Sequence, residues 1–174
     1  MEFAYRPQAW ESMFATVALA AVTLAGLLFV GLSLNLRTIV DSPAHLGRAR
    51  EALLALLVLV IISIFALIPE QGRMALGIEL LVLSILVFAV GLPLQSQTVH
   101  HLRPELRRGW RRRLLALNGA TLAITIAGAG LVTRGLGGLL WLLPTILICL
   151  VWSTYNAWTL VIHAHRSNPE TRRP

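Results

Sequence analysis

Five long stretches of the chain are almost free of charged residues, and this pattern limits what the chain can fold into. Glu79 is their one charged side chain, and they cover residues 12–34, 52–68, 74–94, 114–133 and 138–162. A helix needs about 20 apolar residues to cross the hydrocarbon core of a bilayer. The stretches lack the alternation of a membrane β-strand, and an isolated strand would leave its backbone groups unpaired in lipid. We therefore predict an all-α, polytopic membrane protein, a five-helix transmembrane bundle that forms a single domain over residues 1–174.

The composition excludes several other classes of protein. Charged residues make up 13% of the chain, against about 25% in an average soluble domain. Apolar residues are too abundant for a disordered chain, and one cysteine, Cys149, cannot form a disulfide scaffold. The segment before the first stretch has no basic region of the kind that begins a signal peptide, so we expect a retained helix.

The basic residues indicate how the helices are oriented. All 15 are arginine, and 12 of them fall in alternate segments, beginning with the segment between the first and second stretches. Basic residues are enriched in cytoplasmic loops, so we expect the N-terminus outside and the C-terminus in the cytoplasm. A chain with arginine but no lysine is typical of a GC-rich bacterial genome. We therefore expect a multi-pass protein of the bacterial cytoplasmic (inner) membrane.

One cytoplasmic segment is especially rich in arginine. It precedes the fourth stretch, and its basic residues are Arg107, Arg108, Arg111, Arg112 and Arg113. Arginine clusters beside a membrane bind anionic lipid headgroups, so we expect membrane lipids as partners of this cluster. We expect no nucleic acid there, because no nucleic-acid-binding fold accompanies the cluster.

Glu79 is the one charge inside the predicted spans, on the outer side of the third. Charged groups in lipid are costly and often functional. The carboxylate could accept a proton or bind a cation. Alternatively, it could pair with Arg73 or Arg134, which the predicted topology places on the same side.

Polar residues form two stripes at helical spacing on the fourth and fifth stretches. The fifth stretch contributes Thr145, Cys149, Trp152, Asn156 and Thr159, with His163 directly after its end, and the fourth contributes Asn118, Thr121, Thr125 and Gly128. The stripes could line a hydrated path or a small-molecule site. They could instead hydrogen-bond neighbouring helices, at about 0.6 kcal/mol per contact. A further stripe of small residues gives the fourth stretch two packing faces and predicts a central place for it in the bundle.

We find no sequence pattern for catalysis or metal binding. Intramembrane metalloproteases need His-Glu-x-x-His, and neither this motif, Gly-x-Ser-x-Gly nor a P-loop occurs. The histidines all fall at or beyond the predicted cytoplasmic edge, which disfavours haem or zinc within the membrane. We expect a protein that is not an enzyme and holds no metal or cofactor.

Four segments in and around the first two spans form a recognisable pattern: Trp10-Glu11-Ser12-Met13-Phe14, residues 20–36, Glu51-Ala52-Leu53-Leu54 and Ile68-Pro69-Glu70-Gln71. In these segments the chain resembles a family of small multi-pass bacterial membrane proteins, some of which bear the label "modulator of FtsH protease". The resemblance implies a multi-pass membrane fold and carries over no catalytic residues.

These patterns lead to two hypotheses about function. In the first, the chain is a non-enzymatic accessory, regulatory or scaffold subunit that acts through helix–helix contacts, with copies of itself or with other membrane proteins. In the second, it is a small oligomeric channel or transporter for ions or protons. The second hypothesis uses Asn118, Thr125 and Asn156 as one polar seam, with Glu79 near its outer mouth.

Overall fold

The computed structural model describes residues 2–34, 43–99 and 107–166, and in these ranges the regular structure is entirely helical. Its long helices are α1 (Glu11–Leu34), α3 (Pro43–Ala66), α4 (Arg73–Val99), α5 (Arg107–Thr133) and α6 (Leu142–Arg166). Among the described residues, four helices are long and apolar enough to cross a membrane, and the apolar part of α5, Asn118–Thr133, is shorter. The predicted all-α class is confirmed for the described residues, and four of their helices have the length and apolar composition that a membrane span needs.

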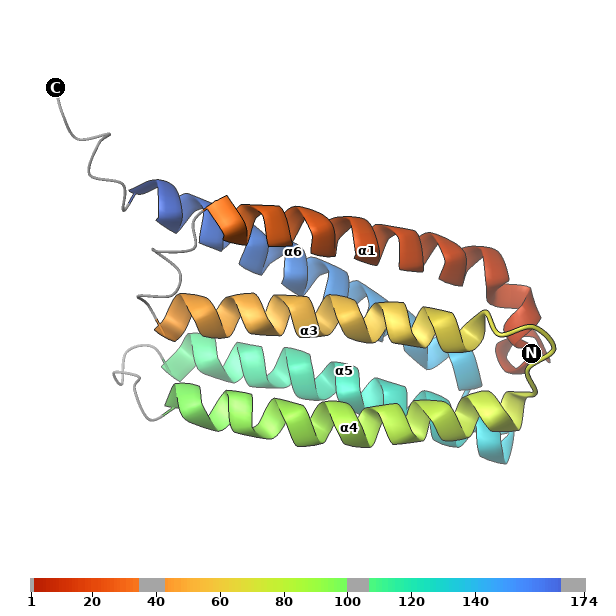
Figure 1. Ribbon diagram of the computed structural model, residues 1–174. Coiled ribbons are helices and arrows are strands. Elements are labelled where there is room, and N and C mark those ends of the chain that lie inside the picture. Colours follow the sequence, from red (N-terminus) through yellow and green to blue (C-terminus); the bar gives the residue numbers. More distant parts are fainter. Residues whose placement is uncertain (1, 35–42, 100–106, 167–174) are drawn as a thin grey trace, which may run out of the picture.

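The long helices run side by side, with α1 along one side of the bundle and α4 along the other (Figure 1). Helices α3 and α6 each pack against three long helices, whereas α5 packs mainly against α4 and α6. Of the helices that qualify as spans α3 is the most buried, which makes it the central helix. The prediction that the fourth stretch would be central is therefore wrong. The reason lies in α3, whose buried small residues let several neighbours approach; they are Ala49, Ala52, Ala55, Ser63 and Ala66.

The helices extend beyond several of the predicted spans. The second predicted span began at residue 52 and ended at residue 68, but α3 begins at Pro43 and ends at Ala66. Proline disfavours helical geometry in the residue before it, so the chain leaves the helix before Pro69 and turns through Glu70, which has a positive φ of 56°. At the start of the last span a short 3-10 helix, η4 (Gly138–Trp141), precedes α6.

Helices α4 and α5 come close enough for backbone contact at two glycines. A Cβ added to Gly128 would lie 2.8 Å from the Gly77 carbonyl oxygen, and one added to Gly77 would lie 2.9 Å from the Gly128 carbonyl oxygen. Each glycine therefore leaves room for the backbone of the other helix. This small-to-small contact fixes how α4 and α5 pack.

The N-terminal segment covers one end of the bundle. It forms two short 3-10 helices, η1 (Glu2–Tyr5) and η2 (Pro7–Trp10), and η1 packs against η4. The contact is tight because a Cβ on Gly138 would lie 2.5 Å from the Ala4 carbonyl oxygen, and Gly138 itself has a φ of 49°. Both the space and the backbone angle favour glycine there. The first residues are thus held against the hairpin that joins α5 to α6.

Candidate functional site

Two hydroxyl groups of α6 form hydrogen bonds to neighbouring helices. Thr145 Oγ1 donates to the Ala120 carbonyl oxygen of α5 at 3.2 Å, and Ser153 Oγ donates to the Ala52 carbonyl oxygen of α3 at 3.2 Å. Thr145 is fully buried and Ser153 is 2% exposed. A hydroxyl buried among apolar helices needs such a partner, because leaving it unpaired is costly. Thr145 of the α6 stripe and Ser153 beside the stripe therefore join α6 to its neighbours.

The part of the stripe nearer the C-terminus bonds mainly to its own helix. Asn156 Nδ2 donates to the Trp152 carbonyl oxygen at 3.0 Å, and Thr159 Oγ1 donates to the Asn156 carbonyl oxygen at 2.9 Å. Asn156 is 3% exposed. The Trp152 ring lies 6.3 Å from the Tyr155 ring, and its buried Nε1 has no hydrogen-bond acceptor among the described residues. Cys149 lies in the apolar core.

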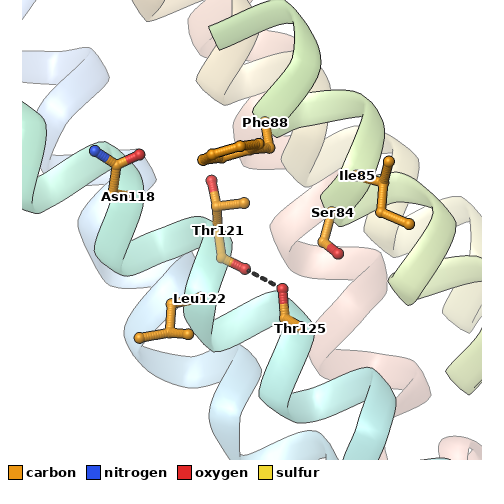
Figure 2. A pocket seen from close by; sticks show the side chains of 7 residues that line it. All are labelled: Ser84, Ile85, Phe88, Asn118, Thr121, Leu122 and Thr125. Atoms are coloured by element: carbon orange, nitrogen blue, oxygen red, sulfur yellow. Dashed lines mark hydrogen bonds between the residues drawn. The ribbon is translucent and has the colours of Figure 1, made fainter. Parts of the chain in front are cut away.

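The stripe on α5 lines a groove shared with α4 (Figure 2). The groove has a volume of about 480 Å³, and its lining residues are Ser84, Ile85, Phe88, Asn118, Thr121, Leu122 and Thr125. Figure 2 shows the Phe88 ring over Thr121, with Asn118 further along α5. On α5 the groove begins at Thr125, one turn from Gly128, where the two helices are in backbone contact.

Two of the groove's hydroxyl groups already have partners. Ser84 Oγ donates to the Leu81 carbonyl oxygen at 2.8 Å, and Thr125 Oγ1 donates to the Thr121 carbonyl oxygen at 3.0 Å. Asn118 differs from them, because its side chain is exposed and makes no hydrogen bond to any described residue. The groove thus presents one free amide beside an apolar wall.

The two polar stripes lie at different interfaces. Asn118 and Thr125 line the groove between α5 and α4, whereas Asn156 is buried on α6. The expected seam of Asn118, Thr125 and Asn156 is therefore not formed. The physical reason is that α5 turns its apolar face inward, through the buried residues Ala120, Ile124, Ala127 and Leu131, and α6 packs on that side.

Glu79 has a different partner from the arginines expected for it. Its Oε2 accepts a hydrogen bond of 2.7 Å from Nε2 of Gln71, which lies in the turn between α3 and α4. Arg73 instead donates from Nη1 to the Leu131 and Val132 carbonyl oxygens, at 2.6 and 3.2 Å. These carbonyls end α5, where a cation is favourable because the helix dipole is negative there. In this position Arg73 joins the ends of α4 and α5.

Sequence reasoning missed Gln71, which is 9% exposed and whose Oε1 has no hydrogen-bond donor among the described residues. It also missed Glu51 and Ser63, which are buried in α3. Gln71 and Glu51 fell just outside the predicted spans. A buried polar residue next to a span boundary has no periodic signal that would reveal it.

Several predicted residues cannot be placed by their side chains. The arginines of the cluster, residues 107–113, belong to the first turns of α5, but their side chains lie outside the described part of the structure. The same holds for His163, and two of the other histidines considered as metal ligands, His100 and His101, lie outside the described residues. Among the described residues, no group of three or more His, Cys, Asp or Glu side chains could hold a metal ion.

No protein-family model matches the chain, and no curated protein and no solved structure is significantly similar to it. The resemblance to small bacterial membrane proteins stays a prediction. The geometry of the chain itself must therefore support any functional proposal.

Proposed function

We propose that the chain is a non-enzymatic subunit of a membrane assembly and that it docks through α1 against another transmembrane helix. In this proposal all five long helices cross the bacterial cytoplasmic membrane. The N-terminus lies outside, and the arginine-rich segments face the cytoplasm.

The observation that carries this proposal is the low burial of α1. In the most apolar 18-residue stretch of this helix only 11% is buried. The corresponding stretches of the three other helices that qualify as membrane spans are 28% to 56% buried. Helix α1 packs against α3 and α6 on one side and leaves the other side uncovered. A second helix could therefore pack along α1 without any change in the bundle.

The uncovered side has a shape that suits a helix. We call Leu19, Val22, Gly26 and Val30 the α1 outer face; their spacing of three, four and four places them on one side of the helix. Gly26 has no atom within 4 Å of the place where a Cβ would lie. Glycine within a helix costs about 1 kcal/mol relative to alanine. In membranes such small residues let a second backbone approach closely.

The interior polar groups also support a structural role. Thr145 and Ser153 are used in hydrogen bonds between helices, and the two polar stripes are not aligned in one path. A channel within one copy would need polar groups that face each other along the bundle axis. A subunit that acts through helix contacts needs only a stable bundle with an open face.

Photo-crosslinking in native membranes tests the proposal. A photoreactive residue at position 26 should yield a protein adduct of one defined mass, because the docked helix lies against the α1 outer face. The matched control is position 82 on α4, where Val82 is 51% exposed on a helix at the other side of the bundle. Protein adducts at neither position, or equally at both, would show that the α1 outer face is not a docking surface.

A further inference from the structure

The groove between α4 and α5 places a free amide in an apolar setting. In the described structure Asn118 is exposed and has no hydrogen-bonding partner, while Ser84 and Thr125 bond to carbonyl oxygens of their own helices. A primary amide has two N–H donors and one acceptor. In a bilayer no bulk water is present to satisfy these groups, so a ligand that accepts from the amide gains a strong advantage.

The walls of the groove are shaped by long apolar side chains that no helix covers. Ile85 is 67% exposed, Phe88 is 50% exposed and Leu122 is 60% exposed. They flank the space of about 480 Å³ between the two helices (Figure 2). A single hydrocarbon chain fits a groove that is open along one side and lined by such residues.

The sequence of α5 places positive charge at one end of the groove. Arg111 precedes Asn118 by seven residues, so its backbone position is on the same side of α5 and about 10 Å closer to the helix N-terminus. The N-terminal end of a helix also carries a partial positive charge. In addition, Cα–Cβ bonds tilt toward the helix N-terminus, so the Asn118 side chain leans toward the arginine-rich end.

We propose that the groove is a binding site for one anionic glycerophospholipid. One acyl chain lies along Ile85, Phe88 and Leu122, and the Asn118 amide donates to an ester carbonyl oxygen of the glycerol backbone. The phosphate lies at the level of the first two turns of α5, where the positive charge stabilises it. The order of groups along the site, cationic then amide then apolar, is the order of phosphate, ester and chain in the lipid.

Charge also argues against a second copy of the chain in this groove. In a two-fold symmetric membrane dimer the same ends of the two α5 helices would lie next to each other. Each carries five arginines over residues 107–113, and like charges this close repel. An anionic lipid removes this repulsion. The lipid site lies across the bundle from the α1 outer face, so it is independent of the proposed docking of α1.

Lipid binding to the purified full-length chain in detergent tests the site by native mass spectrometry. The probes are dioleoyl phosphatidylglycerol, which is anionic, and dioleoyl phosphatidylcholine, which has no net charge. We expect the wild-type chain to bind one phosphatidylglycerol in preference to phosphatidylcholine. Asn118→Leu should weaken the binding of both lipids about fivefold, equal to about 1 kcal/mol, because both have the ester carbonyl.

Two further variants separate the parts of the site. Leu122→Trp fills the groove and should weaken both lipids, whereas Arg111→Gln with Arg112→Gln should remove the preference for phosphatidylglycerol. Thr154→Val is the matched control, since Thr154 is exposed on α6 and bonds only to the Leu150 carbonyl oxygen. It should bind both lipids like the wild type.

Three results would overturn the proposal. Unchanged binding in both Asn118→Leu and Leu122→Trp would mean that lipids do not enter the groove, even if the arginine variants lose binding to the headgroup. A wild-type chain that binds both lipids equally would refute the anionic preference. A dimer that Leu122→Trp abolishes, with lipid binding unchanged, would assign the groove to a second copy of the chain.

Discussion

Replacing Gly128 with alanine tests the packing of α4 against α5. The added Cβ would lie 2.8 Å from the Gly77 carbonyl oxygen and 3.0 Å from Leu81 Cγ, whereas an ordinary contact begins at 3.4 Å. The backbones must therefore move apart by about 0.6 Å, which is the difference between 3.4 and 2.8 Å. A gap of about 0.5–1 Å already loses a quarter to a half of the dispersion energy between the atoms that separate.

The expected cost follows from these distances. Forcing one extra carbon into a packed interface costs about 1–3 kcal/mol. A loss of 1–2 kcal/mol lowers the ratio of folded to unfolded protein by a factor of about 5 to 30. The Gly77 carbonyl belongs to a helix backbone and cannot rotate away as a side chain would. We therefore expect Gly128→Ala to lower the free energy of unfolding by at least about 1–2 kcal/mol.

The assay is unfolding of the full-length chain in mixed micelles, followed by circular dichroism as the fraction of denaturing detergent rises. The matched control is Gly119→Ala on the same helix, because no atom lies within 4 Å of the Cβ that it would add. Gly119→Ala should unfold at the same or a higher detergent fraction, since alanine favours a helix more than glycine does. If Gly128→Ala and Gly119→Ala unfold together, the close approach of α4 and α5 is refuted.

Three other substitutions test separate contacts. Thr145→Val removes the hydrogen bond from α6 to α5 and should lower the free energy of unfolding by about 0.6 kcal/mol in the same titration. A free energy of unfolding equal to that of the exposed control Thr154→Val would contradict the contact. Arg73→Met removes the two hydrogen bonds to the end of α5 and should lower the stability of that end by about 1.5–3 kcal/mol. Amide hydrogen exchange near Leu131 should then be faster, and unchanged exchange would refute the role of Arg73. Gly138→Ala should release the N-terminal segment from η4, because its Cβ would lie 2.5 Å from the Ala4 carbonyl oxygen, and limited proteolysis should then cut the first ten residues sooner than in the wild type.

The all-helical class, with helices long and apolar enough to cross a membrane, could be predicted because long apolar stretches without β-alternation indicate it. The turn after α3 was also predictable in kind, since Pro69 cannot continue a helix. The helix ends were less predictable: α3 begins at Pro43, well before the apolar stretch, because polar residues can continue a helix beyond its apolar part.

The contacts between helices could not be predicted with the same success. A periodic stripe shows that residues share a face but does not identify the neighbour, so Asn118 was expected to face α6 and instead lines the groove with α4. The central place of α3 depends on Ala49, Ala52 and Ala55, which are unremarkable in a leucine-rich and alanine-rich sequence. Gln71 was overlooked as a partner of Glu79 because it lies in a turn, where only the folded chain brings it close.

The most direct test of the proposed function is the mass of the complex that forms around the chain in its own membrane. Native mass spectrometry after mild extraction should show the wild-type chain in a complex of defined composition, with copies of itself or with another membrane protein. Gly26→Trp should dissociate this complex because its side chain fills the space beside Gly26 that the docked helix would occupy. Val82→Trp on α4 should leave the complex intact. A wild-type chain extracted only as a monomer, or a complex that survives Gly26→Trp, would contradict docking through α1.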